Sequence, residues 1–102
     1  MALYWYVSEE PPIIESKFEL GPIGITPGVQ QQIEPQEIIS AIRRHAQCDW
    51  GDLCEEDIAA NEWSLKNEAR LLSAYQSSLR VKFYIVTEAD RSSTTVLLTS
   101  EY

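Results

Sequence analysis

One short segment of the chain, CDWGDLCEED at residues 48–57, gathers most of the side chains that could do chemistry. Its two thiols and the nearby imidazole of His45 are ligands that zinc prefers. The order His45-x2-Cys48-x5-Cys54 nevertheless matches none of the established zinc spacings, which bring cysteines or histidines together in two close pairs. We therefore expect no metal and no cofactor, with Cys54 buried and Cys48 exposed. Metal binding through His45, Cys48 and Cys54 stays open as an alternative.

Carboxylates from two parts of the chain could instead form an acid–base cluster. Acidic groups beside a histidine in a cleft can divide the roles of acid and base according to pKa. The candidates for such a cluster are His45, Asp49, Asp52, Glu88, Asp90 and Arg91. The sequence has no Ser-His-Asp spacing, no nucleophile elbow and no glycine-rich phosphate loop. We therefore assign no catalytic residue and keep a small enzyme as a second alternative.

The same residues have structural interpretations that need no ligand. We expect Asp52 to cap a helix, Asp49 to accept N–H groups in its turn, and Asp90 to begin a turn between strands. Arg91 is expected to brace that turn by pairing with Asp49 or Asp52, because guanidinium groups suit bidentate pairing with carboxylates. His45, near the end of a helix, is expected to favour its cationic form.

Trp50 has two interpretations, as part of the core or as part of an interface. A tryptophan beside a glycine in a helix–helix loop is expected to cover the core, yet tryptophan and arginine also anchor protein interfaces. The alternative to a purely structural role is a partner-binding surface. The sequence places that surface at Asp49, Trp50, Asp52, Glu88, Asp90 and Arg91.

The formal net charge of −8 on 102 residues restricts the kinds of partner. Direct nucleic-acid binding needs clustered lysine and arginine, and the chain has only eight such residues, which are scattered. An acidic surface suits a protein partner with a basic surface. The start of the chain lacks the pattern of a signal peptide, and no apolar run reaches the length of a membrane span. We therefore expect a cytoplasmic protein without membrane association.

Two helices are predicted in the first half of the chain. Thr26 and Pro27 form a favourable helix start, which predicts a short helix over residues 27–33. A second helix begins at Pro35. Its apolar residues recur with helical spacing and predict one buried stripe, formed by Ile38, Ile39, Ile42 and Ala46.

A third predicted helix spans residues 53–67. Asp52 as N-cap, followed by Glu55 three residues later, resembles a capping box. We expect the buried side of this helix to come from four apolar residues, Leu53, Ile58, Leu65 and Trp63.

The last third of the chain has the composition of β-structure. β-branched and aromatic residues predict strands at 70–76, 80–88 and 93–99, joined by two short turns. Three helices followed by three strands predict an α+β fold, with two or three short helices packed on a three-stranded antiparallel meander. Residues 25–102 are expected to form this single domain.

Residues 1–24 are expected to form an N-terminal arm or edge strand that is partly flexible. The aromatic sequence LYWYVS at residues 3–8 suggests a short strand, and residues 13–20 suggest a weak edge strand or an extended arm. Such an arm could add a strand to another chain. Self-association and partner binding through the arm both stay open, as does the oligomeric state.

Several blocks of the sequence resemble a family of small, uncharacterised bacterial proteins that are often described as plasmid-related. The blocks are ITPGVQQQI, RRHAQCDWGDLCEED, LLSAY and VKFYIVTEADRSSTTVLLTSEY. The resemblance covers residues 25–102. Cys48 stands where the family pattern has glycine, and Thr99 where it usually has proline, so a role for the Cys48 thiol would not be a family property.

The resemblance implies a protein encoded on plasmids or other mobile elements. Together with the charge, it leads us to expect a small acidic protein-binding or regulatory module. A narrower hypothesis is an accessory factor of a mobile element that inhibits a nucleic-acid-handling defence enzyme by presenting an acidic, DNA-mimicking surface.

Overall fold

A computed structural model of the protein describes residues 14–102. The strand predicted at residues 3–8 lies outside the described residues. Residues 14–20 form neither helix nor strand, so the edge strand predicted over 13–20 is wrong for this part.

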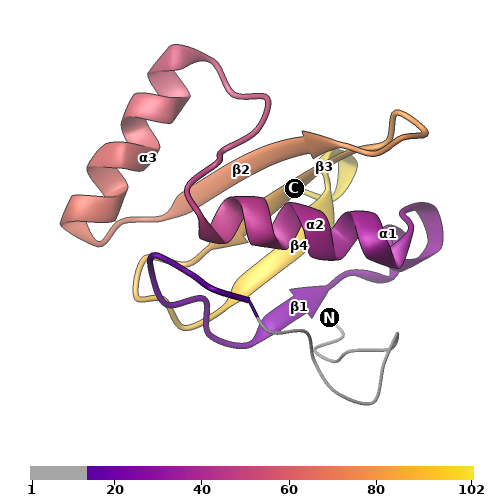
Figure 1. Cartoon of the computed structure of the whole chain (residues 1–102), viewed down its shortest axis with the longest axis horizontal. Helices are drawn as coiled ribbons and strands as arrows, with labels where there is room; N and C mark the ends of the chain where they lie inside the picture. The colour runs from indigo at the N-terminus through magenta and orange to yellow at the C-terminus, as the bar shows by residue number, and fades with distance from the viewer. Residues whose placement is uncertain (1–13) are drawn as a thin grey trace.

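The sheet has four strands in the spatial order β1-β4-β3-β2 (Figure 1). The last three are β2 (Leu71–Gln76), β3 (Lys82–Thr87) and β4 (Thr94–Leu98), and they form the predicted antiparallel meander. β1 (Ile23–Ile25) pairs in parallel with β4, in register Ile23 with Thr94. The α+β class is therefore confirmed, but the purely antiparallel three-stranded sheet is wrong. β1 is short and flanked by Pro22 and Pro27, and its strand conformation depends on pairing with a segment about 70 residues away.

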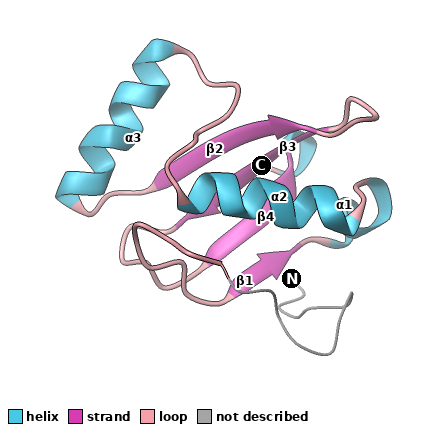
Figure 2. Cartoon of the chain, in the orientation of Figure 1, coloured by secondary structure: helices cyan, strands magenta, loops and turns pink. Residues whose placement is uncertain are grey.

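Two helices cover one face of the sheet (Figure 2). α1 (Pro27–Gln32) begins as predicted, because the Thr26 hydroxyl accepts a hydrogen bond from the Val29 N–H at 3.3 Å. α2 (Pro35–Ala46) buries the predicted stripe of Ile38, Ile39, Ile42 and Ala46. Ile38 and Ile42 pack on the inward side chains of the strands, which include Tyr75, Phe83, Ile85, Val96 and Leu98. A short 3₁₀ turn, η1 (Thr99–Glu101), follows β4.

The third helix, α3 (Glu55–Asn67), lies beyond the β2 edge and apart from α1 and α2 (Figure 1). Its buried residues are both polar, Asn61 and Ser64. The predicted apolar side is therefore wrong: Ile58 and Trp63 are exposed, and Leu53 and Leu65 are only half-buried. The helix also begins two residues later than predicted.

Asp52 does not cap α3. The N-cap position is Cys54, which makes no side-chain capping bond, so the predicted capping box is wrong. Asp52 instead uses its backbone, since its N–H donates to the Ala74 carbonyl at 2.7 Å. The acidic first turn, formed by Glu55, Glu56 and Asp57, stabilises the helix start through the helix dipole without a cap.

Backbone groups on the outer edge of β2 are hydrogen-bonded at two places, by the chain around Gly51 and by the side chain of Asn61. Around Gly51 the chain forms an isolated parallel bridge with Ala74, in which the Ala74 N–H donates to the Trp50 carbonyl at 3.1 Å. Two residues before Ala74 in the same strand, the Asn61 side-chain amide donates to the Leu72 carbonyl at 2.7 Å and accepts from the Leu72 N–H at 3.1 Å. Asn61 thus substitutes for the peptide group of a neighbouring strand, because its amide has the same donor and acceptor.

None of the helices in residues 14–102 combines the length and the apolar character needed to cross a membrane.

Replacing Gly51 with alanine tests the edge closure. Gly51 has φ +75°, and an added Cβ would overlap the Ala74 carbonyl oxygen and approach the Tyr75 ring at 2.8 Å. We expect Gly51→Ala to lower the free energy of unfolding by at least about 2 kcal/mol in a urea titration. Ser40→Ala, at an exposed position of α2, is the control and should change it by less than about 0.5 kcal/mol. Equal stability of the two variants would show that the bridge at Gly51 is not required.

Candidate functional site

Asp49 pairs with an arginine of its own neighbourhood rather than with Arg91. Its Oδ2 accepts from Arg44 Nε at 2.8 Å and its Oδ1 from Arg44 Nη2 at 3.2 Å, a bidentate arrangement on the surface. Asp49 Oδ1 also accepts from the Gly51 N–H at 3.3 Å, as predicted for a turn. The hydrogen bond to Arg44 lowers the pKa of Asp49. The predicted pairing of Asp49 or Asp52 with Arg91 is therefore wrong.

Trp50 covers the core, as predicted, with only 4% of its surface exposed. Its indole N–H donates to Glu62 Oε2 on α3 at 2.8 Å. Its ring stacks on Phe18 at a centroid distance of 6.3 Å and meets the edge of His45 at 5.7 Å. Trp50 therefore links the α2–α3 corner to α3 and to the irregular segment before β1.

Arg91 braces its turn through backbone carbonyls instead of carboxylates. Its Nη1 donates to Ala69 O at 2.7 Å and to Glu88 O at 3.1 Å, and its Nη2 donates to Ser64 O at 3.2 Å. These carbonyls belong to α3, to the loop that follows it and to the turn between β3 and β4. Arg91 also lies over the ring of Phe18 at 5.9 Å. One guanidinium thus ties three segments together.

Glu88 and Asp90 act within the turn that holds Arg91. The Glu88 N–H donates to Ser93 O at 3.0 Å, and Glu88 Oε2 lies 3.9 Å from Arg70 Nη2. Asp90 is exposed and accepts from the Ser92 N–H at 3.0 Å, as expected for the start of a turn. Hydrogen bonds from Ser92 lower the pKa of Asp90. The six residues that the sequence selected therefore lie in two clusters, which both contact Phe18 and α3.

His45 is fully buried and neutral, so the predicted cationic form is wrong. Burial, assisted by the nearby positive charge of Arg91, lowers the pKa of His45 from 6.5 to about 3. Its Nδ1 lies 2.5 Å from Ser73 Oγ and its Nε2 lies 2.8 Å from Thr87 Oγ1. The helix end favours a cation, but desolvation is the larger effect at this depth.

The tautomer of His45 follows from counting donors along the chain of hydroxyls. Thr94 Oγ1 has one proton, which it donates to Leu20 O at 2.7 Å. In the 2.8 Å hydrogen bond between the two threonine hydroxyls, Thr94 Oγ1 must therefore accept, and Thr87 Oγ1 donates its proton to it. Thr87 can then only accept from the imidazole, which places the proton on Nε2. Nδ1 is left to accept from Ser73.

The interior around His45 does not provide an open reaction site. Ser73, Thr87 and Thr94 are fully buried like His45 itself, and Phe18 meets the imidazole edge-on at a centroid distance of 5.3 Å. The side chains proposed for acid–base chemistry are committed to other partners or face solvent. The geometry therefore offers no support for the enzyme alternative.

The thiols and the imidazole do not form a metal site in the described part of the chain. Both imidazole nitrogens of His45 already have hydroxyl partners. Cys54 is exposed and Cys48 is half-buried, the reverse of the predicted order. Within residues 14–102 no group of three or more histidine, cysteine or acidic side chains could hold a metal ion.

The surface that sequence reasoning missed is the outer face of α3. Residues on the side opposite Asn61 and Ser64 follow from the helical period and are all exposed; we define this face as Glu55, Glu56, Ala59, Trp63 and Lys66. Trp63 has 61% of its surface exposed. The signal in the sequence was the weak apolar periodicity of this segment, in which large apolar residues are isolated among polar residues and alanines.

The chain matches no known protein-family model, no curated protein and no solved structure. The resemblance to plasmid-related proteins and the partner-binding role of the six selected residues therefore stay predictions. The fold and the site define an α+β domain with a mixed sheet and a protruding acidic helix.

The protonation of His45 can be measured directly, because it is the only histidine of the chain. We expect ¹⁵N NMR of the imidazole to show the neutral Nε2–H tautomer from pH 7 down to about pH 4, given a folded-state pKa of about 3.

The lowered pKa of His45 also predicts how the free energy of unfolding depends on pH. Between the unfolded pKa of 6.5 and the folded pKa of about 3, the unfolded chain binds the proton and the folded chain does not. His45 therefore lowers the free energy of unfolding as the pH falls through this window, by up to about 1.4 kcal/mol per pH unit. A histidine that titrates near pH 6 in the folded protein would contradict the buried network.

Proposed function

We propose that this protein is a protein-binding module whose contact surface is the outer face of α3. The observation that carries the proposal is the exposure of Trp63 on a helix whose buried residues are both polar. A 13-residue helix with so little packing is marginal in water. A partner that covers Trp63 would bury a large aromatic surface that the domain itself leaves in solvent.

Charge supports a basic partner. Six of the acidic residues lie between positions 49 and 62, and no lysine or arginine occurs in that interval. Asp49 and Glu62 already have partners, which leaves four carboxylates. Of these, Glu55 and Glu56 lie on the outer face, Asp52 precedes the helix, and Asp57 lies on its other side. Such a surface would accelerate and orient the approach of a positively charged protein.

A narrower form of the proposal concerns the identity of that partner. The acidic start of α3 is suited to occupy the DNA-binding surface of a nucleic-acid-handling enzyme, as an inhibitor encoded by a mobile element would. The support is the charge distribution and the sequence resemblance. In this form duplex DNA and the protein would compete for the partner.

Substitution of Trp63 tests the proposal. The full chain is used to capture partners from cells that naturally make it, and the purified partner is then titrated with each variant by calorimetry. We expect Trp63→Ser to weaken binding at least ten-fold, because exposed tryptophans at interfaces are common hot spots. Since Trp63 is exposed, the variant should unfold at the same urea concentration as the wild type.

Leu79→Ser is the matched control. Leu79 is 76% exposed in the turn between β2 and β3, away from α3, and its loss should leave binding unchanged. The double variant Glu55→Gln/Glu56→Gln should flatten the salt dependence of binding. If Trp63→Ser and Leu79→Ser bind the partner equally well, the outer face of α3 is not the contact surface. Failure of duplex DNA to displace the partner would reject only the narrower form.

A further inference from the structure

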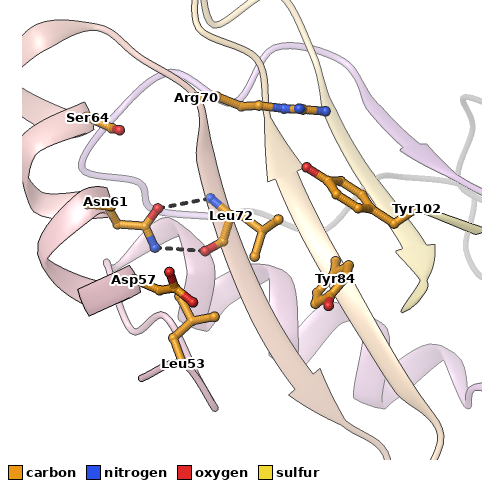
Figure 3. Close-up of a pocket in the computed structure, with 9 residues that line it drawn as sticks. Leu53, Asp57, Asn61, Ser64, Arg70, Leu72, Tyr84 and Tyr102 are labelled. Carbon is orange, nitrogen blue, oxygen red and sulfur yellow. Dashed lines mark hydrogen bonds between the residues drawn. The ribbon is translucent and has the colours of Figure 1, made fainter. Parts of the chain in front are cut away.

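A cavity of about 350 Å³ lies between α3 and the face of the sheet that α1 and α2 leave uncovered. Leu72 on β2 and Tyr84 on β3 contribute from this face, because alternate residues of each strand point away from the core. Figure 3 shows Leu53 and Asp57 on the α3 side of this pocket and Arg70 toward its other end. The volume falls in the range of small-molecule sites, about 300–1,000 Å³.

Two groups of opposite charge lie at opposite ends of the pocket. Asp57 is in the first turn of α3, whereas Arg70 follows the end of α3, beyond Ser64. At 1.5 Å per residue, the helix rises about 10 Å from Asp57 to Ser64. Arg70 lies over the Tyr102 ring at 5.5 Å, and its 3.9 Å approach to Glu88 is too long for a hydrogen bond. The Arg70 guanidinium therefore retains donors for a further anion.

The middle of the pocket is mainly apolar. The Tyr84 and Tyr102 rings meet at a centroid distance of 5.3 Å with an interplanar angle of 77°, which gives one wall two aromatic surfaces. Leu53, Ala60 and Leu72 supply aliphatic surface. The amide of Asn61 is already paired with the Leu72 backbone, so it adds shape rather than a free polar group.

We propose that this pocket binds a small dipolar molecule, an amino acid derivative whose amino and carboxylate groups are separated by an apolar body. The carboxylate pairs with Arg70, the ammonium group pairs with Asp57, and the apolar body lies against Leu72 and the two tyrosine rings. This site is distinct from the outer face of α3, which lies on the opposite side of the helix, and it does not depend on the proposed function.

Three probes that share a para-substituted benzene ring test this arrangement on the full chain at pH 7. 4-(Aminomethyl)benzoate carries both charges, 4-methylbenzoate carries only the anion and 4-methylbenzylamine carries only the cation. We expect ¹⁵N-resolved NMR titrations to shift the amides of Leu72 and Tyr84, with the doubly charged probe binding about five-fold more tightly than either singly charged one. A chain of net charge −8 would otherwise favour the pure cation.

Variants assign each charge to its residue. Arg70→Gln should reduce binding of the doubly charged probe to the level of 4-methylbenzylamine, and Arg70→Lys should restore most of it. Asp57→Asn should reduce it to the level of 4-methylbenzoate. Ala60→Phe, at an exposed position of α3, should fill the pocket and abolish binding of all three probes.

Arg80→Gln, in the exposed turn before β3, is the charge-matched control and should leave all three affinities unchanged. The proposal is overturned if the three probes bind equally, or if 4-methylbenzylamine binds best. It is also overturned if Arg80→Gln and Arg70→Gln have the same effect, or if the shifted amides lie away from the pocket.

Discussion

The position of α3 depends on the need to pair the backbone groups at the outer edge of β2. An unpaired strand edge exposes backbone donors and acceptors that can pair with other chains. Here the bridge at Gly51 and the amide of Asn61 satisfy those groups at Ala74 and Leu72. Because Asn61 belongs to α3, the same hydrogen bonds that close the sheet also hold the helix beside it. The attachment is polar, so α3 remains otherwise exposed.

Local patterns were enough to predict the parts of the fold that local interactions form. The apolar stripe of α2 and the alternation of β2, β3 and β4 were found because each repeats over several turns or residue pairs. β1 was missed because three residues between prolines acquire strand structure only from β4. The buried side of α3 was predicted wrongly for a related reason, since the residues that it buries are Asn61 and Ser64 rather than apolar residues.

The candidate site was harder to predict because its residues are defined by distant partners. His45 was expected to be charged at a helix end, yet Ser73 and Thr87 from two strands enclose it and burial keeps it neutral. Arg91 was expected to meet carboxylates, yet it donates to carbonyls of α3 and the following loop. His45, Trp50 and Arg91 thus serve mainly to hold segments of the domain together. The two surfaces for which we propose ligands lie on opposite sides of α3.

The most direct test of this account is hydrogen exchange of the Asn61→Ala variant, with Asn67→Ala as control. Asn67 lies on the same helix, but its amide donates within the helix, to Trp63 O at 2.8 Å. If polar contacts with β2 hold α3, Asn61→Ala should raise exchange throughout α3 and at Leu72 while β3 and β4 stay protected. Asn67→Ala should affect only the end of the helix. Protection of α3 that is unchanged in Asn61→Ala, or lost equally in all elements, would contradict the account.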